Sequence, residues 1–181
     1  MIRAIAAMAL ISASAHSLAA STSKAEPALS SSIPWWEKVT VTIAGDGKPQ
    51  ACRYESSIDP KAAKDCDVTG SQAAMAESSG SKSDLTRITF ERRFTPGALP
   101  ASAELQPGDT LLGRQVMTLA IDPAGSVKGC KIVATSGDMT PDYSCKDAAA
   151  EKFEAIAAKT AANGREGVMT ILVYGHAEHV V

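Results

Sequence analysis

The chain has 181 residues, of which 45% are hydrophobic, 21% are charged and only 4% are aromatic. This length suffices for one ordinary domain or two small ones, with a core that is mostly aliphatic. The formal net charge of −2 lacks the basic excess of a dedicated nucleic-acid binder, so we expect no nucleic-acid partner.

The N-terminal segment has the features of a secretory signal peptide. Arg3 provides a positive charge, and the apolar residues 4–15 form a stretch that is too short to span a bilayer. We therefore expect residues 1–19 to be a cleaved signal peptide and residues 20–34 a flexible leader. The mature protein is expected in the periplasm, with no membrane-spanning segment; an uncleaved inner-membrane anchor is the alternative.

The two halves of the chain resemble each other in the spacing of their cysteines. Each half has a cysteine five residues after a glycine of a predicted turn, and a second cysteine 14 or 15 residues further on. A duplicated unit with one internal disulfide in each copy is the simplest explanation. We therefore predict the disulfides Cys52–Cys66 and Cys130–Cys145, which fit an oxidising compartment. Pairing between the halves, or reduced thiols, is the alternative.

The first half, residues 35–94, is predicted to be a ββαβ-like unit. Gly45-Asp46-Gly47 favours a hairpin turn, and Asp59-Pro60 favours the start of a short helix. Ile88 and Phe90 of the closing strand are expected to face inward. The expected strand, strand, helix and strand cover residues 39–43, 50–57, 59–66 and 85–94.

The second half, residues 110–176, repeats this order after a predicted linker over residues 95–109, which contain three prolines and two glycines. Its strands are expected over residues 114–122, 127–135 and 168–174, with Met117, Leu119 and Ile121 on one face. A helix is expected to begin at Thr140-Pro141 and to carry the apolar stripe Ala149, Phe153, Ile156 and Thr160. Residues 177–181 are expected to be a tail. The predicted fold class is α+β, with two tandem ββαβ units that each contain a disulfide.

Residues 108–176 resemble the C-terminal domain of the TonB energy-transducer family, and residues 36–94 resemble it more weakly. The resembling segments are Gly113 to Asp122, Gly125-Ser126-Val127, Thr135-Ser136-Gly137 and the predicted helix around Ala148, Ala149 and Phe153. Gly129-Cys130 together with Cys145 resembles a disulfide-bearing branch of that family. The resemblance implies a ββαβ unit that recognises an extended peptide of an outer-membrane receptor by strand addition. Leu105-Gln106-Pro107 stands where the family usually has a Tyr-Pro pair.

The residue pattern predicts no catalytic, cofactor or metal site. The sequence contains no nucleophile–base–acid set, no P-loop and no dinucleotide fingerprint, so we expect no enzyme. His176, Glu178 and His179 are interpreted as a solvated tail rather than a metal site. Trp35-Trp36 is interpreted as a core anchor rather than a peptide-binding patch, and Arg92-Arg93 as a solvated strand end rather than an anion site.

These observations favour a periplasmic, non-enzymatic interaction protein. We expect it to bind extended peptides or receptor plugs by strand addition, in TonB-dependent transport, with a protein or peptide such as an outer-membrane receptor as partner. A free-standing structural or inhibitor-like module, unrelated to receptor energisation, is the alternative. The last strand of the chain is expected at a sheet edge. Its peptide-binding residues would be Val168, Met169, Thr170, Ile171, Leu172, Val173 and Tyr174.

Overall fold

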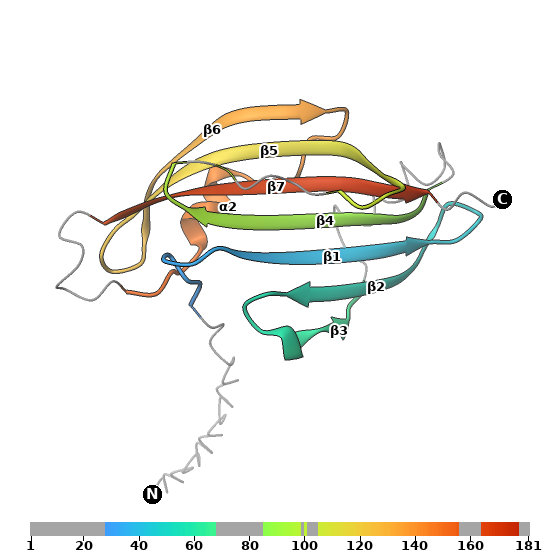
Figure 1. The fold of residues 1–181 in the computed structure, drawn as a ribbon, viewed down its shortest axis with the longest axis horizontal. Helices are drawn as coiled ribbons and strands as arrows, with labels where there is room; N and C mark the ends of the chain where they lie inside the picture. Colours follow the sequence, from blue (N-terminus) through green and yellow to red (C-terminus); the bar gives the residue numbers. More distant parts are fainter. Residues whose placement is uncertain (1–27, 68–84, 99, 101–104, 156–163, 178–181) are drawn as a thin grey trace, which may run out of the picture.

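The computed structural model describes residues 28–67, 85–98, 100, 105–155 and 164–177. Within these ranges the strands form one antiparallel sheet in the order β3-β2-β1-β4-β7-β5-β6 (Figure 1). The strands are β1 (Trp35–Ile43), β2 (Pro49–Ser56), β3 (Lys64–Asp65), β4 (Leu85–Pro96), β5 (Asp109–Ile121), β6 (Val127–Gly137) and β7 (Arg165–Ala177). The helical elements are the 3₁₀ helix η1 (Pro60–Ala62) and the α-helix α2 (Cys145–Ala150).

The single sheet contradicts the expected α+β fold of two tandem ββαβ units. The closing strand of the first half, β4, pairs with β7, the last strand of the second half. This pairing runs from Leu85 opposite Ala177 to Pro96 opposite Gly167. The two halves therefore share one hydrogen-bonded sheet. The predicted linker is also shorter than expected, since β4 continues to Pro96.

The two halves place their strands in the same order on either side of this junction. β1 lies between β2 and β4, just as β5 lies between β6 and β7. The sheet thus has an internal two-fold relation whose centre lies between β4 and β7. Val41 lies opposite Cys52 and Ile88, and its equivalent Leu119 lies opposite Cys130 and Gly167. Across the junction, Ile88 lies opposite Gly175, and its equivalent Gly167 lies opposite Pro96.

Both predicted hairpins are present, and their turns have the predicted chemistry. Gly47 has a φ of 82° in the turn between β1 and β2, and Gly125 has a φ of 81° in the turn between β5 and β6. At Gly125, a Cβ atom would also lie 2.0 Å from the carbonyl oxygen of Phe153. This turn therefore requires glycine both for its backbone conformation and for the close approach of the covering chain.

The helix predicted for the second half is wrong in its bounds. α2 begins after Ser144, whose side chain accepts hydrogen bonds from Lys146 N and Asp147 N in a capping box. This cap is a stronger start signal than Pro141, which lies outside the helix. α2 ends at Ala150. Beyond it the chain is extended, and the predicted positions 156 and 160 lie outside the described residues.

In the first half, the helix begins where the sequence predicts. The side chain of Asp59 accepts a hydrogen bond from Lys61 N at 3.0 Å, and Pro60 is the first residue of η1. The helix is only one 3₁₀ turn, because the chain straightens to pair β3 with β2 before it reaches Cys66.

The hydrophobic core lies on the face of the sheet that α2 covers. Phe94 is at its centre, with ring centroids 5.7 Å from Trp35 and 5.2 Å from Phe153. Trp35 is 3% exposed, so the interpretation of Trp35-Trp36 as a core anchor is confirmed for Trp35. It is wrong for Trp36, which is only half-buried and lies 5.2 Å from Lys38 Nζ. The predicted leader contributes as well, since Leu29 is buried and forms a β-bridge with Phe153. The other buried members of this cluster are Met117, Leu119, Ile121, Val127, Ala148, Met169 and Ile171.

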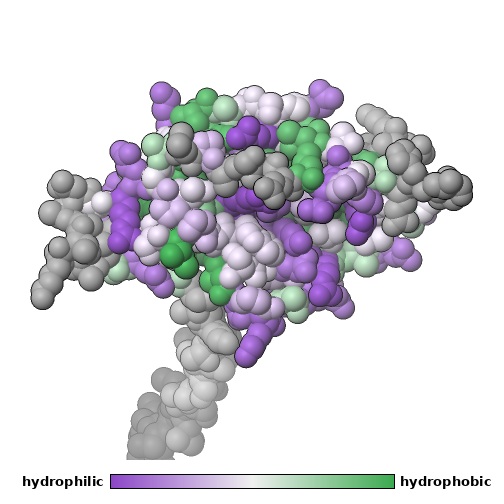
Figure 2. All heavy atoms as spheres, in the orientation of Figure 1, coloured by the Kyte–Doolittle hydropathy of each residue, from purple (hydrophilic) through white to green (hydrophobic). Residues whose placement is uncertain are grey.

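The opposite face of the sheet is more polar. The strands pass in front of α2 in Figure 1, so Figure 2 shows this face, on which hydrophilic side chains are frequent. Thr40, Thr89 and Glu91 belong to it, and the hydroxyls of Thr40 and Thr89 lie 3.2 Å apart. Within the described residues, no helix is both long and apolar enough to cross a membrane.

The shared sheet predicts that the two halves unfold together. A Cβ atom at Gly167 would lie 2.3 Å from the Phe94 ring, whereas nothing lies within 4 Å of one at Gly45. We expect Gly167→Ala to lower the free energy of unfolding by about 1–3 kcal/mol, and Gly45→Ala by less than about 0.5 kcal/mol. The measurement is urea unfolding followed by tryptophan fluorescence, because both tryptophans lie in the first half. An unshifted fluorescence transition in Gly167→Ala would show that the halves unfold independently.

Candidate functional site

The strand predicted to bind a peptide is not at an edge of the sheet. β7 contains residues 168–174 and lies between β4 and β5, with which it pairs along its length. Its side chains are also buried, from Val168 at 2% exposure to Val173 at 0%. The expected edge position was wrong, because the last strand in the chain is not the last strand in the sheet. The first half supplies the neighbour that covers it.

β6 is the strand that the structure leaves at an open edge. It is the last strand of the sheet order, and no described residue pairs with its outer side (Figure 1). Every residue from 131 to 137 is exposed, including Ile132 at 44% and Val133 at 49%. A strand edge of this kind presents N–H and C=O groups with which a further strand can pair. We take this segment, residues 131–137, as the candidate binding edge.

The opposite edge of the sheet is protected by three devices. β3 pairs with Arg53 and Tyr54 on the outer side of β2. The disulfide Cys52–Cys66 ties β2 to the residue that follows β3. β2 also begins with Pro49, which has no N–H to offer. Short edge strands and edge prolines are the means by which proteins prevent unwanted strand addition, and β6 has neither.

The turn before β6 fixes where the strand begins. The Asp122 carboxylate accepts a hydrogen bond from Ser126 N at 2.8 Å, and this bond lowers the pKa of Asp122. Lys128 lies 3.4 Å from the same carboxylate. Further along, the register shifts so that Val133 has no partner on β5, which makes a β-bulge within the candidate binding edge.

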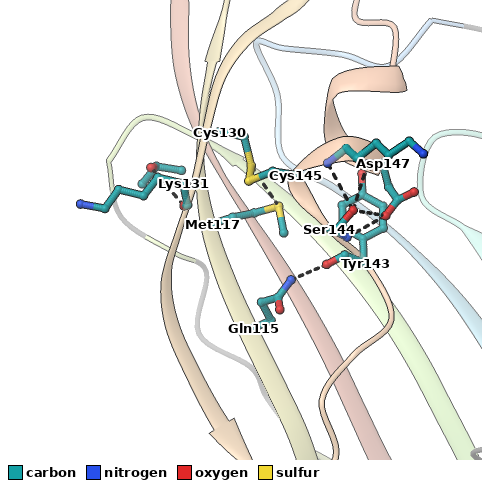
Figure 3. The surroundings of a disulfide bond; sticks show 10 residues. Gln115, Met117, Cys130, Lys131, Tyr143, Ser144, Cys145 and Asp147 are labelled. Atoms are coloured by element: carbon teal, nitrogen blue, oxygen red, sulfur yellow. Dashed lines mark hydrogen bonds between the residues drawn. A yellow bond between two sulfur atoms is a disulfide. The ribbon is translucent and has the colours of Figure 1, made fainter.

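A disulfide attaches β6 to the helix that covers the core. Cys130 of β6 is bonded to Cys145, the first residue of α2, with a Cα–Cα distance of 5.5 Å (Figure 3). The sulfur of Met117 lies 3.9 Å from that of Cys130. Beside them, Gln115 Nε2 donates to the carbonyl oxygen of Tyr143 at 2.5 Å. Both predicted disulfide pairings, including Cys52–Cys66, are confirmed.

Arg92 is not the solvated strand end that the sequence suggested. Its guanidinium donates to Glu37 through Nε at 3.0 Å and through Nη2, and to Glu151 through Nη1. It lies 5.4 Å from the ring centroid of Trp35 and 5.8 Å from that of Tyr143. The β1–β4 register causes this arrangement, because it places Glu37 directly opposite Arg92. A sequence without known strand partners does not contain that information.

Burial and neighbouring charges shift the pKa of Arg92 and of two tyrosines beside it. Burial opposes the charge of Arg92, but Glu37 and Glu151 raise its pKa above the ordinary value. Tyr54 donates to Glu37 at 2.7 Å, and burial together with this bond raises the pKa of Tyr54 to about 12. Burial and the Glu151 carboxylate likewise raise the pKa of Tyr143. Near neutral pH, Arg92 therefore stays charged and both tyrosines stay neutral.

A cavity of about 230 Å³ lies beside this cluster. Its lining includes the apolar side chains of Val39, Phe90 and Val173, together with Tyr143. Arg92 lines it as well, but its guanidinium already has two carboxylate partners. The cavity therefore offers no free guanidinium to an anionic ligand.

On the polar face, His176 belongs to β7 rather than to the predicted solvated tail. Its Nδ1 lies 2.9 Å from a carboxylate oxygen of Asp109, at the start of β5. The other two residues of the rejected metal site, Glu178 and His179, lie outside the described residues. Within the described part of the chain, no group of three or more His, Cys, Asp or Glu residues is placed to hold a metal ion.

Comparison of the chain with protein-family models, with curated proteins and with solved structures finds no match. The similarity to the TonB C-terminal domain therefore rests on the sequence motifs alone, and the function has to be argued from the geometry.

Removing the Arg92 side-chain charge is expected to destabilise the protein, because Glu37 and Glu151 would face each other without a cation. We expect Arg92→Met to lower the free energy of unfolding at pH 7 by roughly 2–4 kcal/mol. The exposed Arg87 of the same strand is the control, and Arg87→Met should cost less than about 0.5 kcal/mol.

Urea unfolding at pH 7 measures both losses. Equal losses in the two variants would contradict the arrangement described above.

Removing either disulfide should cost stability, but only one should loosen α2. Each bond closes a loop of about 15 residues, so each Cys-to-Ala pair should lose about 3 kcal/mol in the chain-entropy model. Cys130→Ala with Cys145→Ala should also remove the protection of the Gln115 side-chain amide, which Cys52→Ala with Cys66→Ala should leave unchanged. Amide hydrogen exchange by NMR distinguishes the two variants, and an unchanged Gln115 amide in the first would show that α2 does not depend on its disulfide.

Proposed function

We propose that this protein is a non-enzymatic binding module that captures an extended polypeptide segment as an additional strand on β6. The observation that carries the proposal is the candidate binding edge, where every residue from 131 to 137 is exposed and no described residue pairs with the outer side. Strand addition uses such backbone groups for affinity and the flanking side chains for specificity.

The surroundings of β6 favour binding because they hold the strand in place before a partner arrives. β5 pairs with its inner side from Val127 to Gly137, and the Cys130–Cys145 bond ties it to α2. A strand that is already ordered loses less conformational entropy on binding than a loop would. The captured segment should run antiparallel to β6, as do all neighbouring strands of the sheet.

The proposed location is the periplasm, and the proposed partner is a peptide segment of another protein. Two disulfides support an oxidising compartment, since such bonds are rare in the reducing cytoplasm. The resemblance to the TonB C-terminal domain supports the same mode of recognition and suggests an outer-membrane receptor segment as the partner. We propose β6 as the accepting strand in place of β7, whose two sides are occupied.

The test is selection of random twelve-residue peptides on the folded protein, followed by hydrogen exchange of the complex. We expect the amides on the outer side of residues 131–137 to become protected. Thr135→Pro and Ser136→Pro form a matched pair, because successive amides of a strand point to opposite sides. One substitution breaks a hydrogen bond to β5 and lowers stability. The other removes an outward donor and should weaken peptide binding about tenfold while leaving the unfolding midpoint within a few degrees.

Two results would contradict the proposal. One is the absence of any selected peptide. The other is a selected peptide that binds with unchanged affinity to the stable proline variant and leaves the amides of β6 unprotected.

A further inference from the structure

The candidate binding edge carries a charge pattern that is complementary to itself. Lys131 stands at its start, and residues 132–137 are uncharged. Asp138 follows directly and is exposed, as is Lys131. In Figure 3, Lys131 projects from β6 on the side away from Cys145, so the disulfide does not obstruct it. An uncharged strand with a cation at one end and an anion at the other fits an antiparallel copy of itself.

We propose that β6 also pairs with β6 of a second copy of this chain, so that self-association controls access to the candidate binding edge. The inference rests on the proposed function in that both require the outer side of β6 to be open. A two-fold axis between Ala134 and Thr135 defines the register. It places Lys131 opposite Asp138 of the second copy at both ends of the contact. A symmetric dimer repeats every contact twice, so both ion pairs form together.

The uncharged middle of this register is compatible with close strand pairing. It places Ile132 opposite Gly137, Val133 opposite Ser136 and Ala134 opposite Thr135 of the second copy. Ile132 and Val133, at 44% and 49% exposure, would lose water contact on association.

The same kind of contact already exists within the chain. β4 and β7 pair antiparallel across the internal two-fold relation, each as the last strand of its half. The proposed dimer would use the other outer strand of the second half in the same geometry. The corresponding outer strand of the first half, β2, is protected by β3 and by the Cys52–Cys66 bond. Since β6 is the one open edge among the described residues, the association closes at a dimer and does not extend into a fibre.

The bulge at Val133 limits the strength of this dimer. A bulge interrupts the regular ladder and increases the local twist, which weakens edge-to-edge pairing. Regular pairing in this register is then limited to Ala134 and Thr135 at its centre, because Ser136 lies opposite the bulged Val133. An interface of this size is typical of weak, exchanging complexes, so a peptide that pairs with β6 can displace the second copy.

Charge reversal at the two ends tests the register. Lys131→Glu places two acidic side chains together at each end, and Asp138→Lys places two basic ones together. Each variant alone should dimerise at least about tenfold more weakly than the native protein. An equimolar mixture of the two should dimerise as well as the native protein, because each end of the mixed dimer pairs opposite charges. Sedimentation velocity over a concentration series measures these associations.

The control is Lys61→Glu, which makes the same charge change on exposed η1, near the protected edge of the sheet. It should dimerise like the native protein. A native protein that stays monomeric, or two single variants that dimerise like the native protein, would overturn the inference. So would a mixture that associates no better than its components.

The outcome is separable from that of the proposed function. Selected peptides that bind β6 of a monomeric native protein would overturn the dimer and leave the proposed function standing. If the protein forms a dimer that follows the charge pattern, but captures no peptide after dilution to monomer, the dimer stands and the proposed function is overturned. If both proposals hold, the selected peptide shifts the native protein from dimer to monomer.

Discussion

The pairing of β4 with β7 is the interaction on which the rest of the structure depends. It joins two halves that are each too small to build a large core into one sheet with a common covered face. Gly167 allows this contact, because any side chain there would meet the ring of Phe94. Phe94 in turn packs between Trp35 of the first half and Phe153 of the second. The junction is thus both a hydrogen-bonded ladder and the centre of the core.

This junction also decides which strands can meet a partner. It places β7 in the middle of the sheet, where its apolar residues are buried. β2 and β6 are the outer strands of the two halves, and their outer sides differ in protection. β2 is paired with β3, and the Cys52–Cys66 bond ties it to the residue after β3. The Cys130–Cys145 bond instead joins β6 to α2, on the covered face of the sheet. One edge of the sheet is therefore protected, and the other remains accessible in the described part of the chain.

The covering layer is small and is held by specific bonds rather than by area alone. α2 has only six residues, and an isolated helix of that length is not stable in water. The Cys130–Cys145 bond holds its start, and Ala148 is buried against the sheet. Glu151, just after its end, is held by Arg92. These contacts keep the covering segment in place over an aromatic-poor core, as disulfides do in other small domains.

The sequence by itself determined the features that depend on neighbouring residues. The two hairpins, the glycine turns, the Asp59 cap and both disulfides follow from local patterns or from loops of about 15 residues. The alternation of Met117, Leu119 and Ile121 also identified the buried face of β5. The helix bounds were less accessible, because the cap at Ser144 competes with the proline signal three residues earlier.

Only the tertiary structure decided which strands are neighbours. β4 and β7 are about 80 residues apart in the chain, and an exposed edge has the same local sequence pattern as an edge that finds a partner. The position of β7, the open side of β6 and the environment of Arg92 all follow from that one long-range choice. The register between β1 and β4 places Glu37 opposite Arg92, so a residue that looks like a solvated cation becomes the centre of a partly buried ion cluster. Strand pairing is set by the fit of whole faces, which no local pattern encodes.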